Sequence, residues 1–157
     1  MARRNRIRLI PVCLVIALVC VACDLQQDIS FDEAGDVPPE GPTVRVVWEE
    51  NEPDGVEVFL NTLDKVVVKE ATVWLLWDIV RAAGLEQEEI LAMRFDFEGA
   101  DGFRPSSRPG CNPRQGEDLA LGYLDPEGLH LLWDDSLELP NCYRVADLAK
   151  ILGEPDS

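Results

Sequence analysis

The chain has 157 residues, of which 30 are acidic and 14 are Lys or Arg, and its formal net charge is −16. So acidic a composition excludes nucleic-acid binding, because contacts to phosphate groups need Lys and Arg. Cations, Ca²⁺ or basic protein surfaces are the partners that this charge favours. The alternative is that the charge only keeps the protein soluble.

The N-terminus, residues 1–22, is predicted to be a signal peptide. Four arginines precede an apolar run from Leu9 to Ala22, which is 14 residues long. A membrane span needs about 20 apolar residues, whereas a basic start followed by a short apolar run is typical of a secretory signal. An uncleaved anchor and an ordinary signal peptide with incidental cysteines are the alternatives.

The end of this segment, Val21-Ala22-Cys23, resembles the lipobox of bacterial lipoproteins, with Cys20 where Leu is usual. In that family the cysteine after the cleavage point is acylated and becomes the first residue of the mature chain. The resemblance implies that acylated Cys23 anchors the chain to a lipid bilayer of the bacterial cell envelope, facing the periplasm or the cell surface. Asp24 resembles an inner-membrane retention signal of the enterobacterial type, and the choice between inner and outer membrane stays open.

The mature chain would be more acidic than the precursor. Residues 1–22 hold four of the 14 basic side chains and none of the 30 acidic ones, which leaves 10 against 30 and a formal charge of −20. Residues 23–42 are polar, acidic and rich in Pro and Gly, so they are predicted to form a lipidated, disordered tether. Residues 43–154, 112 in number, are enough for one core.

The pattern of apolar residues predicts a single mixed, mainly β domain of the α+β class, with one clear helix packed on the sheet. Thr72 is the predicted N-cap of that helix, and Gly84 is the predicted glycine after its end. Trp74 lies opposite the apolar stripe of the helix and is expected to be exposed. In chain order the predicted elements are strands at 43–48, 56–60 and 65–69, the helix at 73–83, a strand at 91–97, a hairpin of 119–124 with 129–133, and a strand, a helix or both at 143–152.

Cys111 and Cys142 are the two cysteines that remain beside Cys23 after cleavage. In an oxidising compartment an even pair indicates a disulfide, here closing a loop of about 30 residues and stabilising the fold by roughly 3 kcal/mol. A pair of free thiols and a two-thiolate metal site are the alternatives. A zinc site normally needs four ligands, and the sequence has one His and no other thiol to complete it.

The loop between Phe103 and Gly116 carries Arg104, Arg108 and Arg114 and no acidic residue. Arginine binds carboxylate or phosphate through two parallel hydrogen bonds, so this loop is a candidate for binding an anionic ligand or a protein partner. The alternative is that the three arginines neutralise nearby acids such as Glu117 and Asp118. Trp74 is the second candidate for partner contact, because exposed aromatic residues are enriched at interfaces.

Three acids, Asp96, Glu98 and Asp101, precede Gly102 and are candidate ligands of a calcium loop. Their register differs from that of an EF-hand, so solvated acids beside a glycine turn are the preferred interpretation, with a looser oxygen site as the alternative. The single histidine, His130, lies within an apolar strand pattern, and no G-x-S-x-G motif is present. The sequence therefore predicts no catalytic site, no metal and no cofactor.

The segments VWLLWDIVRAAGL, GADGFRP and LALGYLD, followed by GLHLLWDD and CYRV, resemble the molybdopterin-binding domain of the sulfite oxidase type. The resemblance covers residues 72–151 and depends mainly on Ala83-Gly84 and Asp101-Gly102-Phe103. The family's metal-binding Cys precedes the helix, where the mature domain has none, and Cys111 does not align with it. The resemblance thus implies a scaffold without the metal chemistry, in which the Asp101-Gly102-Phe103 turn is architectural.

These observations predict a membrane-anchored envelope lipoprotein whose acidic domain is a non-catalytic protein-interaction module. The protein partner is of unknown identity. The alternative is a domain that binds a small anionic ligand or cofactor and is related to molybdopterin-binding oxidoreductase domains. A periplasmic Ca²⁺ module is a third hypothesis.

Overall fold

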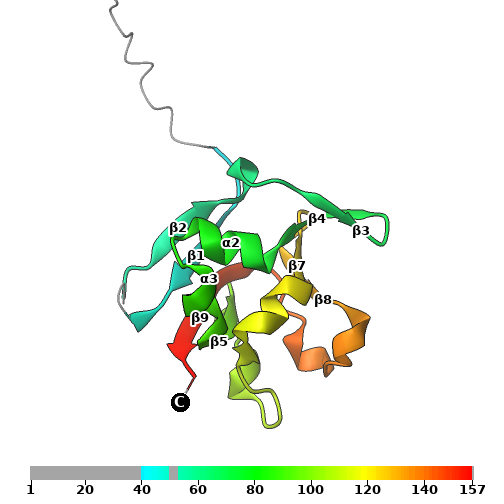
Figure 1. The fold of residues 1–157 in the computed structure, drawn as a ribbon. Coiled ribbons are helices and arrows are strands. Elements are labelled where there is room, and N and C mark those ends of the chain that lie inside the picture. Colours follow the sequence, from blue (N-terminus) through cyan, green and yellow to red (C-terminus); the bar gives the residue numbers. More distant parts are fainter. Residues whose placement is uncertain (1–39, 50–52, 157) are drawn as a thin grey trace, which may run out of the picture. The chain divides into compact units, whose positions relative to one another are not determined.

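The structure is a computed structural model that describes residues 40–49 and 53–156 (Figure 1). The predicted signal peptide, the lipidation site Cys23 and all but the end of the predicted tether lie outside these residues. In the described part strands prevail over helices, which confirms the predicted mixed, mainly β domain of the α+β class.

The first sheet has five strands in the order β2-β1-β9-β5-β6. Strand β9 lies at its centre, pairing in parallel with β1 and antiparallel with β5, and the β5–β9 register shifts between Glu98 and Gly99. The strands are β1 (Thr43–Val47), β2 (Val56–Phe59), β5 (Met93–Gly99), β6 (Arg114–Gln115) and β9 (Leu148–Pro155).

The second sheet has four antiparallel strands in the order β3-β4-β7-β8. Two hairpins make it up, and Figure 1 shows the β3–β4 hairpin extending away from the body of the domain. Strand β3 is the edge of this sheet and pairs only with β4 among the described residues. The strands are β3 (Val66–Val68), β4 (Ala71–Leu75), β7 (Gly122–Asp125) and β8 (His130–Trp133).

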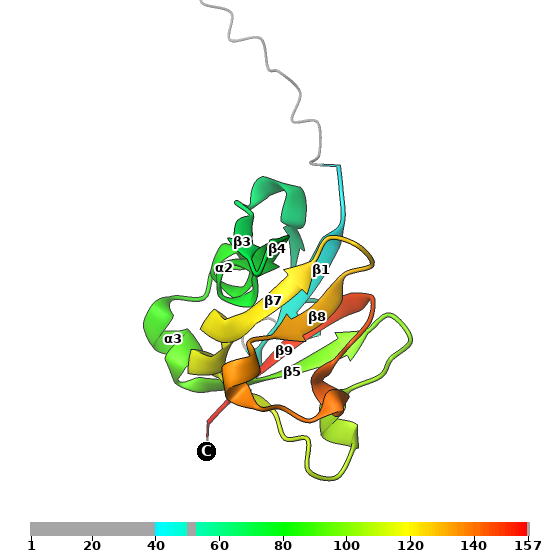
Figure 2. The ribbon, with the colours of Figure 1, turned by 90° about the vertical axis from the view of Figure 1, so that its right-hand side faces the viewer.

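Two short α-helices and several 3₁₀ turns connect the strands (Figure 2). Helix α2 follows β4 without a break, and Gly84, at φ +109°, follows its end as predicted. The helices are α2 (Leu76–Ala82) and α3 (Gln87–Leu91), and the 3₁₀ turns are η2 (Leu60–Thr62), η3 (Pro105–Ser107), η4 (Gly116–Leu121), η5 (Asp135–Leu137) and η6 (Asn141–Tyr143).

A single large core joins both sheets and α2. Phe95, Phe97 and Ile151 contribute from the first sheet, and Leu124 and Leu131 from the second, all fully buried. Figure 2 shows the β7–β8 hairpin facing β9 and β5, and the ring of Phe97 meets that of Trp133 edge-on at a centroid distance of 5.4 Å. Such pairs contribute about 0.5–1.5 kcal/mol beyond the burial of their area, so this contact helps hold the sheets together.

The predicted helix at 73–83 is wrong over its first turn. Residues 71–75 form strand β4, which pairs with β3 on one side and with β7 on the other. Thr72 is therefore a strand residue rather than an N-cap, and the helix begins at Leu76. The sequence VWL is compatible with both a helix and a strand. The strand forms because β3 and β7 satisfy its backbone hydrogen-bonding groups on both sides.

Several other elements lie where they were predicted or close to it. Strands β1, β2 and β3 match their predicted ranges within about two residues, the usual uncertainty of element ends. Helix α3 was missed, and the segment before β7 is the 3₁₀ turn η4 rather than a strand. Gly116 in η4 lies so close to α3 that an added Cβ would be 1.7 Å from the carbonyl oxygen of Ile90.

The Asp101-Gly102-Phe103 turn has the architectural form that was expected. One carboxylate oxygen of Asp101 accepts a hydrogen bond of 2.9 Å from the backbone N–H of Phe103. Gly102 adopts φ +78°, which favours glycine, and its N–H donates to the carbonyl of Gly99 at 2.9 Å. Phe103 packs against the core, so the turn closes the end of β5.

Candidate functional site

The second sheet carries a groove of about 410 Å³ on its surface. Its floor is apolar and aromatic, and its rim carries charges of both signs. The strands β3, β4, β7 and β8 form one side, and residues 134–144 form the other. The lining residues are Val68, Lys69, Ala71, Val73, Tyr123, Leu132, Trp133, Asp134, Asp135, Glu138, Leu139, Pro140, Tyr143 and Arg144.

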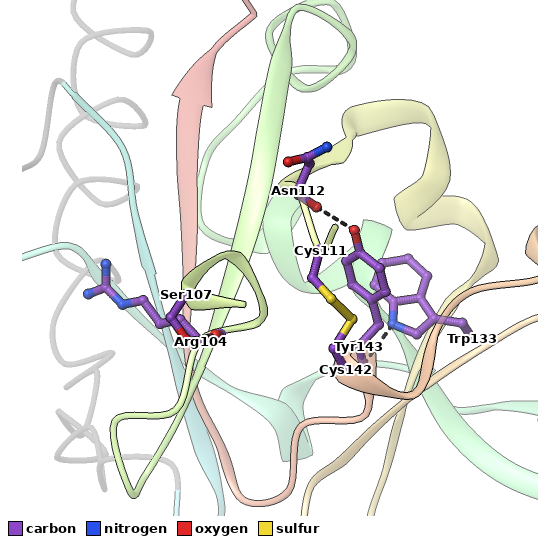
Figure 3. The surroundings of a disulfide bond; sticks show 7 residues. All are labelled: Arg104, Ser107, Cys111, Asn112, Trp133, Cys142 and Tyr143. Carbon is purple, nitrogen blue, oxygen red and sulfur yellow. Dashed lines mark hydrogen bonds between the residues drawn. A yellow bond between two sulfur atoms is a disulfide. The ribbon is translucent and has the colours of Figure 1, made fainter. Parts of the chain in front are cut away.

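A disulfide and two hydrogen bonds hold the 134–144 wall of the groove (Figure 3). Cys142 is joined to Cys111 with a Cα–Cα distance of 6.5 Å, which is the predicted pairing. The indole N–H of Trp133 donates to the carbonyl of Tyr143 at 3.1 Å, and the Tyr143 hydroxyl donates to the carbonyl of Asn112 at 2.6 Å. The wall is thereby connected both to β8 and to the loop after β5.

A salt bridge spans the groove from the β3–β4 turn to the opposite wall. The ammonium group of Lys69 lies 2.5 Å from a carboxylate oxygen of Asp135, and the two side chains are 61% and 92% exposed. Lys69 and Glu70 form the two-residue turn and have φ +47° and +71°, a left-handed conformation in which Asn-Gly is usual. A non-glycine residue is disfavoured there, so this backbone is an outlier of the kind that clusters at binding sites.

Three of the four described groups whose pKa departs clearly from its ordinary value line this groove. The hydrogen bond to Asp135 raises the pKa of Lys69. The backbone N–H of Ser136 donates to Asp134 at 3.0 Å and lowers the pKa of that carboxyl. Burial raises the pKa of Tyr123. Perturbed groups gathered in a concave site are a mark of function, although ion-pair networks perturb pKa values too.

The prediction that Trp74 is exposed and contacts a partner is wrong. Its side chain is 1% exposed and belongs to the core, because Trp74 pairs with Leu124 in the second sheet instead of lying on an outer helix face. The ammonium group of Lys65 lies 4.5 Å from the centroid of its ring. Trp74 therefore anchors the β3–β4 hairpin from within.

The three arginines of the predicted binding loop turn to three different partners. Arg104 forms an ion pair with Glu98, and Arg108 lies 4.8 Å from the ring centroid of Phe103. Arg114 binds Asp118 at 2.5 Å, one of the acids named in the alternative interpretation. None of the three lines the groove. The geometry thus favours neutralisation of neighbours over a shared anion site.

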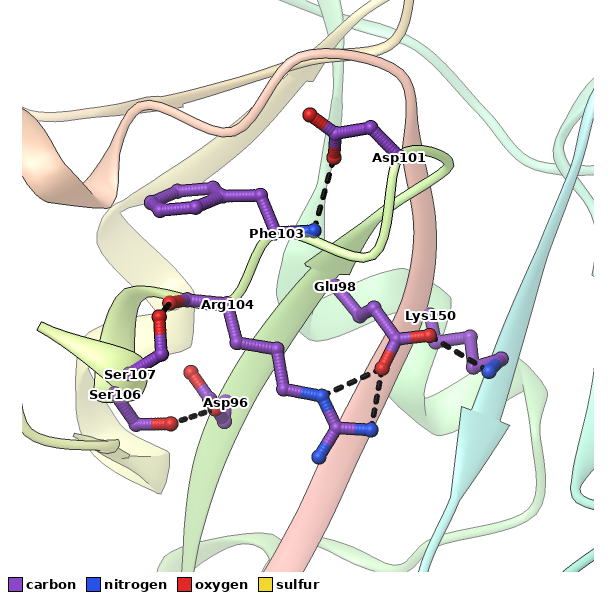
Figure 4. A network of polar contacts seen from close by, with 8 residues as sticks. All are labelled: Asp96, Glu98, Asp101, Phe103, Arg104, Ser106, Ser107 and Lys150. Atoms are coloured by element: carbon purple, nitrogen blue, oxygen red, sulfur yellow. Dashed lines mark hydrogen bonds and ion pairs between the residues drawn. The ribbon is translucent and has the colours of Figure 1, made fainter.

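The acids weighed as calcium ligands are likewise engaged separately (Figure 4). Asp96, 8% exposed, accepts a hydrogen bond from the hydroxyl of Ser106, and Asp101 caps its own turn. Glu98 binds Lys150 at 2.7 Å as well as Arg104, and the hydrogen bond from Lys150 lowers its pKa. Within residues 40–49 and 53–156 no group of three or more His, Cys, Asp or Glu side chains is placed to hold a metal ion.

The groove is not predictable from the sequence. Its residues come from four strands and from a segment far along the chain, residues 134–144. The signal available in the sequence was the run Lys65–Lys69, three valines between two lysines before a turn without Gly or Asn. The groove is suited to binding rather than to a reaction. It has an apolar and aromatic floor, the Lys69–Asp135 salt bridge and further charges at the rim.

No protein-family model matches this chain, and comparisons with curated proteins and with solved structures found no match. The resemblances to bacterial lipoproteins and to the molybdopterin-binding domain therefore stay predictions. In the part of the chain that the structure describes, no helix has the length and apolar character of a membrane span. The function is argued from the groove itself.

Proposed function

We propose that this chain is a cell-envelope lipoprotein, anchored through acylated Cys23, whose domain binds another protein and performs no catalysis of its own. The observation that carries the proposal is the groove between the β3–β4 hairpin and residues 134–144. It combines Tyr123, Trp133 and Tyr143 with aliphatic side chains and with charges at the rim. Aromatic residues at the centre and polar groups at the rim are the composition of protein interfaces.

Electrostatics favours a basic protein as the partner. The groove is lined by Lys69 and Arg144 against Asp134, Asp135 and Glu138, so two positive charges meet three negative ones. The mature chain around it carries a formal −20, from 10 basic and 30 acidic side chains. Such a field draws basic proteins toward the surface and repels anionic ligands.

The anchor is tested by Cys23→Ala. Without the thiol no acyl chain is attached, so the variant is expected to be released from membranes or to accumulate unprocessed. Detergent phase partitioning of cell fractions measures this directly. Unchanged membrane partitioning of the variant at the mass of the processed chain, rather than of the precursor, would show that Cys23 is not the anchor, while leaving the binding role of the groove untouched.

The binding role is tested by photo-crosslinking of the full chain in the cells that produce it. A photo-reactive amino acid replaces Leu132, which lines the groove and is 36% exposed, and in a matched control it replaces Leu91 of α3, which is 48% exposed and outside the groove. We expect a discrete crosslinked product with a second protein from position 132 and none from position 91. Monomer alone from both positions, or the same products from both, would contradict the proposal.

A further inference from the structure

Strand β3, the open edge beside the groove, has a second feature that the groove alone does not explain. Its middle residue, Val67, is 73% exposed and is the most exposed large apolar side chain of the described residues. Strands at the edge of a sheet usually carry charged residues, especially Lys, that prevent pairing with other chains. Lys65 and Lys69 flank the three valines in the positions for such protection.

Both lysines are turned away from the edge to partners within the domain. The ammonium group of Lys65 lies 4.5 Å from the ring centroid of Trp74, and that of Lys69 lies 2.5 Å from Asp135. Lys69 reaches Asp135 from a turn in the left-handed conformation, at φ +47°. The usual protection of an edge strand is therefore directed inward, and Val67 faces solvent without it.

The backbone of Val67 is oriented to accept a further strand. In the β3–β4 register, Val68 faces Ala71 next to the two-residue turn, and Val67 faces Thr72. In such hairpins the pair closing the turn is the hydrogen-bonded one, and hydrogen-bonded and non-bonded pairs alternate along the ladder. The N–H and C=O of Val67 consequently point away from β4, toward the open side of the sheet.

The charges left at this edge are negative. Asp64 and Glu70 lie just outside the two lysines, both exposed, and neither forms an ion pair within the described residues. With the lysines engaged elsewhere, the edge presents an apolar centre between two unpaired carboxylates. A segment with an apolar residue between basic ones is its electrostatic and apolar complement.

We propose that β3 binds an extended segment of the partner protein by strand addition, with an apolar side chain over Val67 and basic residues beside Asp64 and Glu70. The added strand pairs with the backbone of Val67 and borders the groove, into which its neighbouring side chains reach. Main-chain hydrogen bonds supply affinity in this mode of recognition, and alternate side chains supply specificity. The inference rests on the proposed binding function and names its partner segment.

The test combines a crosslinking residue at position 72, where the exposed Thr72 of β4 faces Val67, with substitution of Val67 in the full chain. Val67→Pro removes the outward N–H and is tolerated at an edge position, whereas Val67→Ile keeps both the N–H and the apolar side chain. We expect the crosslink at position 72 to fall roughly tenfold with Val67→Pro, as for the loss of one backbone hydrogen bond, and to persist with Val67→Ile. Mass spectrometry of the product is expected to show a partner peptide with an apolar residue between basic ones.

Four outcomes would overturn strand addition, and they are separable from failure of the proposed function. These are an undiminished crosslink with Val67→Pro, an acidic partner peptide, a product between two copies of this chain, and a product with residues 24–39 of the same chain. If position 132 still yields the heterologous product in the first of these cases, binding in the groove stands and only strand addition is wrong. Circular dichroism and the thermal melt of Val67→Pro establish that the variant is folded.

Discussion

The domain uses charged side chains in two opposite ways, at Glu98 in the first sheet and at Lys69 in the second. The side chain of Glu98 is 13% exposed and binds both Arg104 and Lys150, which fastens the arginine loop to β5 and β9. Lys69 and Asp135 are 61% and 92% exposed, and they bridge two segments across an open groove. Exposed ion pairs contribute about 0–1 kcal/mol, so stability does not account for the second pair.

This contrast separates a structural region from an interaction region within one small domain. Around Glu98 the three acids considered as ligands each bind a different neighbour, and the one carboxylate oxygen of Asp96 that has no hydrogen-bond partner is buried. Near Lys69, the ion pair with Asp135 turns the lysine side chain away from the β3 edge. It also connects the two walls of the groove. Three experiments test this distinction.

The largest effect is expected from paired truncations in the two regions, Phe97→Ala and Val67→Ala. Phe97 is fully buried and contacts Trp133, so its truncation leaves a cavity and is expected to cost about 3–5 kcal/mol. Val67 is 73% exposed, and its truncation is expected to change the free energy of unfolding by no more than about 0.5 kcal/mol.

Urea-induced unfolding of the mature chain, followed by tryptophan fluorescence, measures both variants on one scale. If Val67→Ala destabilises the domain nearly as much as Phe97→Ala, the edge valine serves the fold. The distinction between a structural and an interaction region would then fail at β3.

A smaller effect is expected when acid protonates Glu98. Hydrogen bonds from Lys150 and then Arg104 hold the pKa of Glu98 below its ordinary value of 4.5. A carboxyl whose pKa is lower in the folded state stabilises the fold above its unfolded pKa, and that contribution is lost as the pH falls through the folded pKa. The free energy of unfolding is therefore expected to decrease below pH 4.5, and to do so less in Glu98→Gln.

The control for this measurement is Asp135→Asn, which removes the partner of Lys69 in the groove. Because both groups are exposed, that variant is expected to unfold with the pH dependence of the wild type in the same acidic range. An unchanged acid response in Glu98→Gln would show that the Glu98 network adds nothing to stability, and that the two regions do not differ in this respect.

The sequence predicted the class of fold and the first strands because these depend on local patterns, and it predicted the disulfide because the predicted domain holds two cysteines. Alternating β-branched residues predict the strands, Gly84 marks the end of α2, and two cysteines leave one pairing. The start of α2 was mispredicted because pairing of β4 with β3 and β7 is non-local. For the same reason Trp74, which was predicted to be exposed, is buried in the core.

The candidate site could not be predicted from the sequence, because its residues are also brought together by non-local contacts. The bridge between Lys69 and Asp135 joins residues 66 positions apart, so no spacing rule finds it. The arginine loop, in contrast, drew attention because its charges are close in sequence. Those charges have neighbours of opposite sign close by, as Arg114 and Asp118 show, and their sequence proximity was a sign of local neutralisation.

The smallest effect is expected at the turn of the β3–β4 hairpin, in Glu70→Gly. Glu70 has φ +71°, where a side chain costs about 1–2 kcal/mol and glycine costs nothing, while glycine loses roughly 0.5–1 kcal/mol more backbone entropy on folding. The net result is an expected stabilisation of about 0 to 1.5 kcal/mol, measured by urea unfolding. The matched control is Glu88→Gly in α3, where the same change in a right-handed helix is expected to cost about 1 kcal/mol.

A gain in stability together with a weaker crosslink at position 132 would show that the turn keeps a strained glutamate for binding. The carboxylate of Glu70 would then contribute to the partner contact, as the negative charge of the β3 edge predicts. A loss of stability would mean that Glu70 makes a favourable interaction in the turn. In that case its left-handed conformation is explained by the fold, and the difference between the two regions rests on Val67 and Lys69 alone.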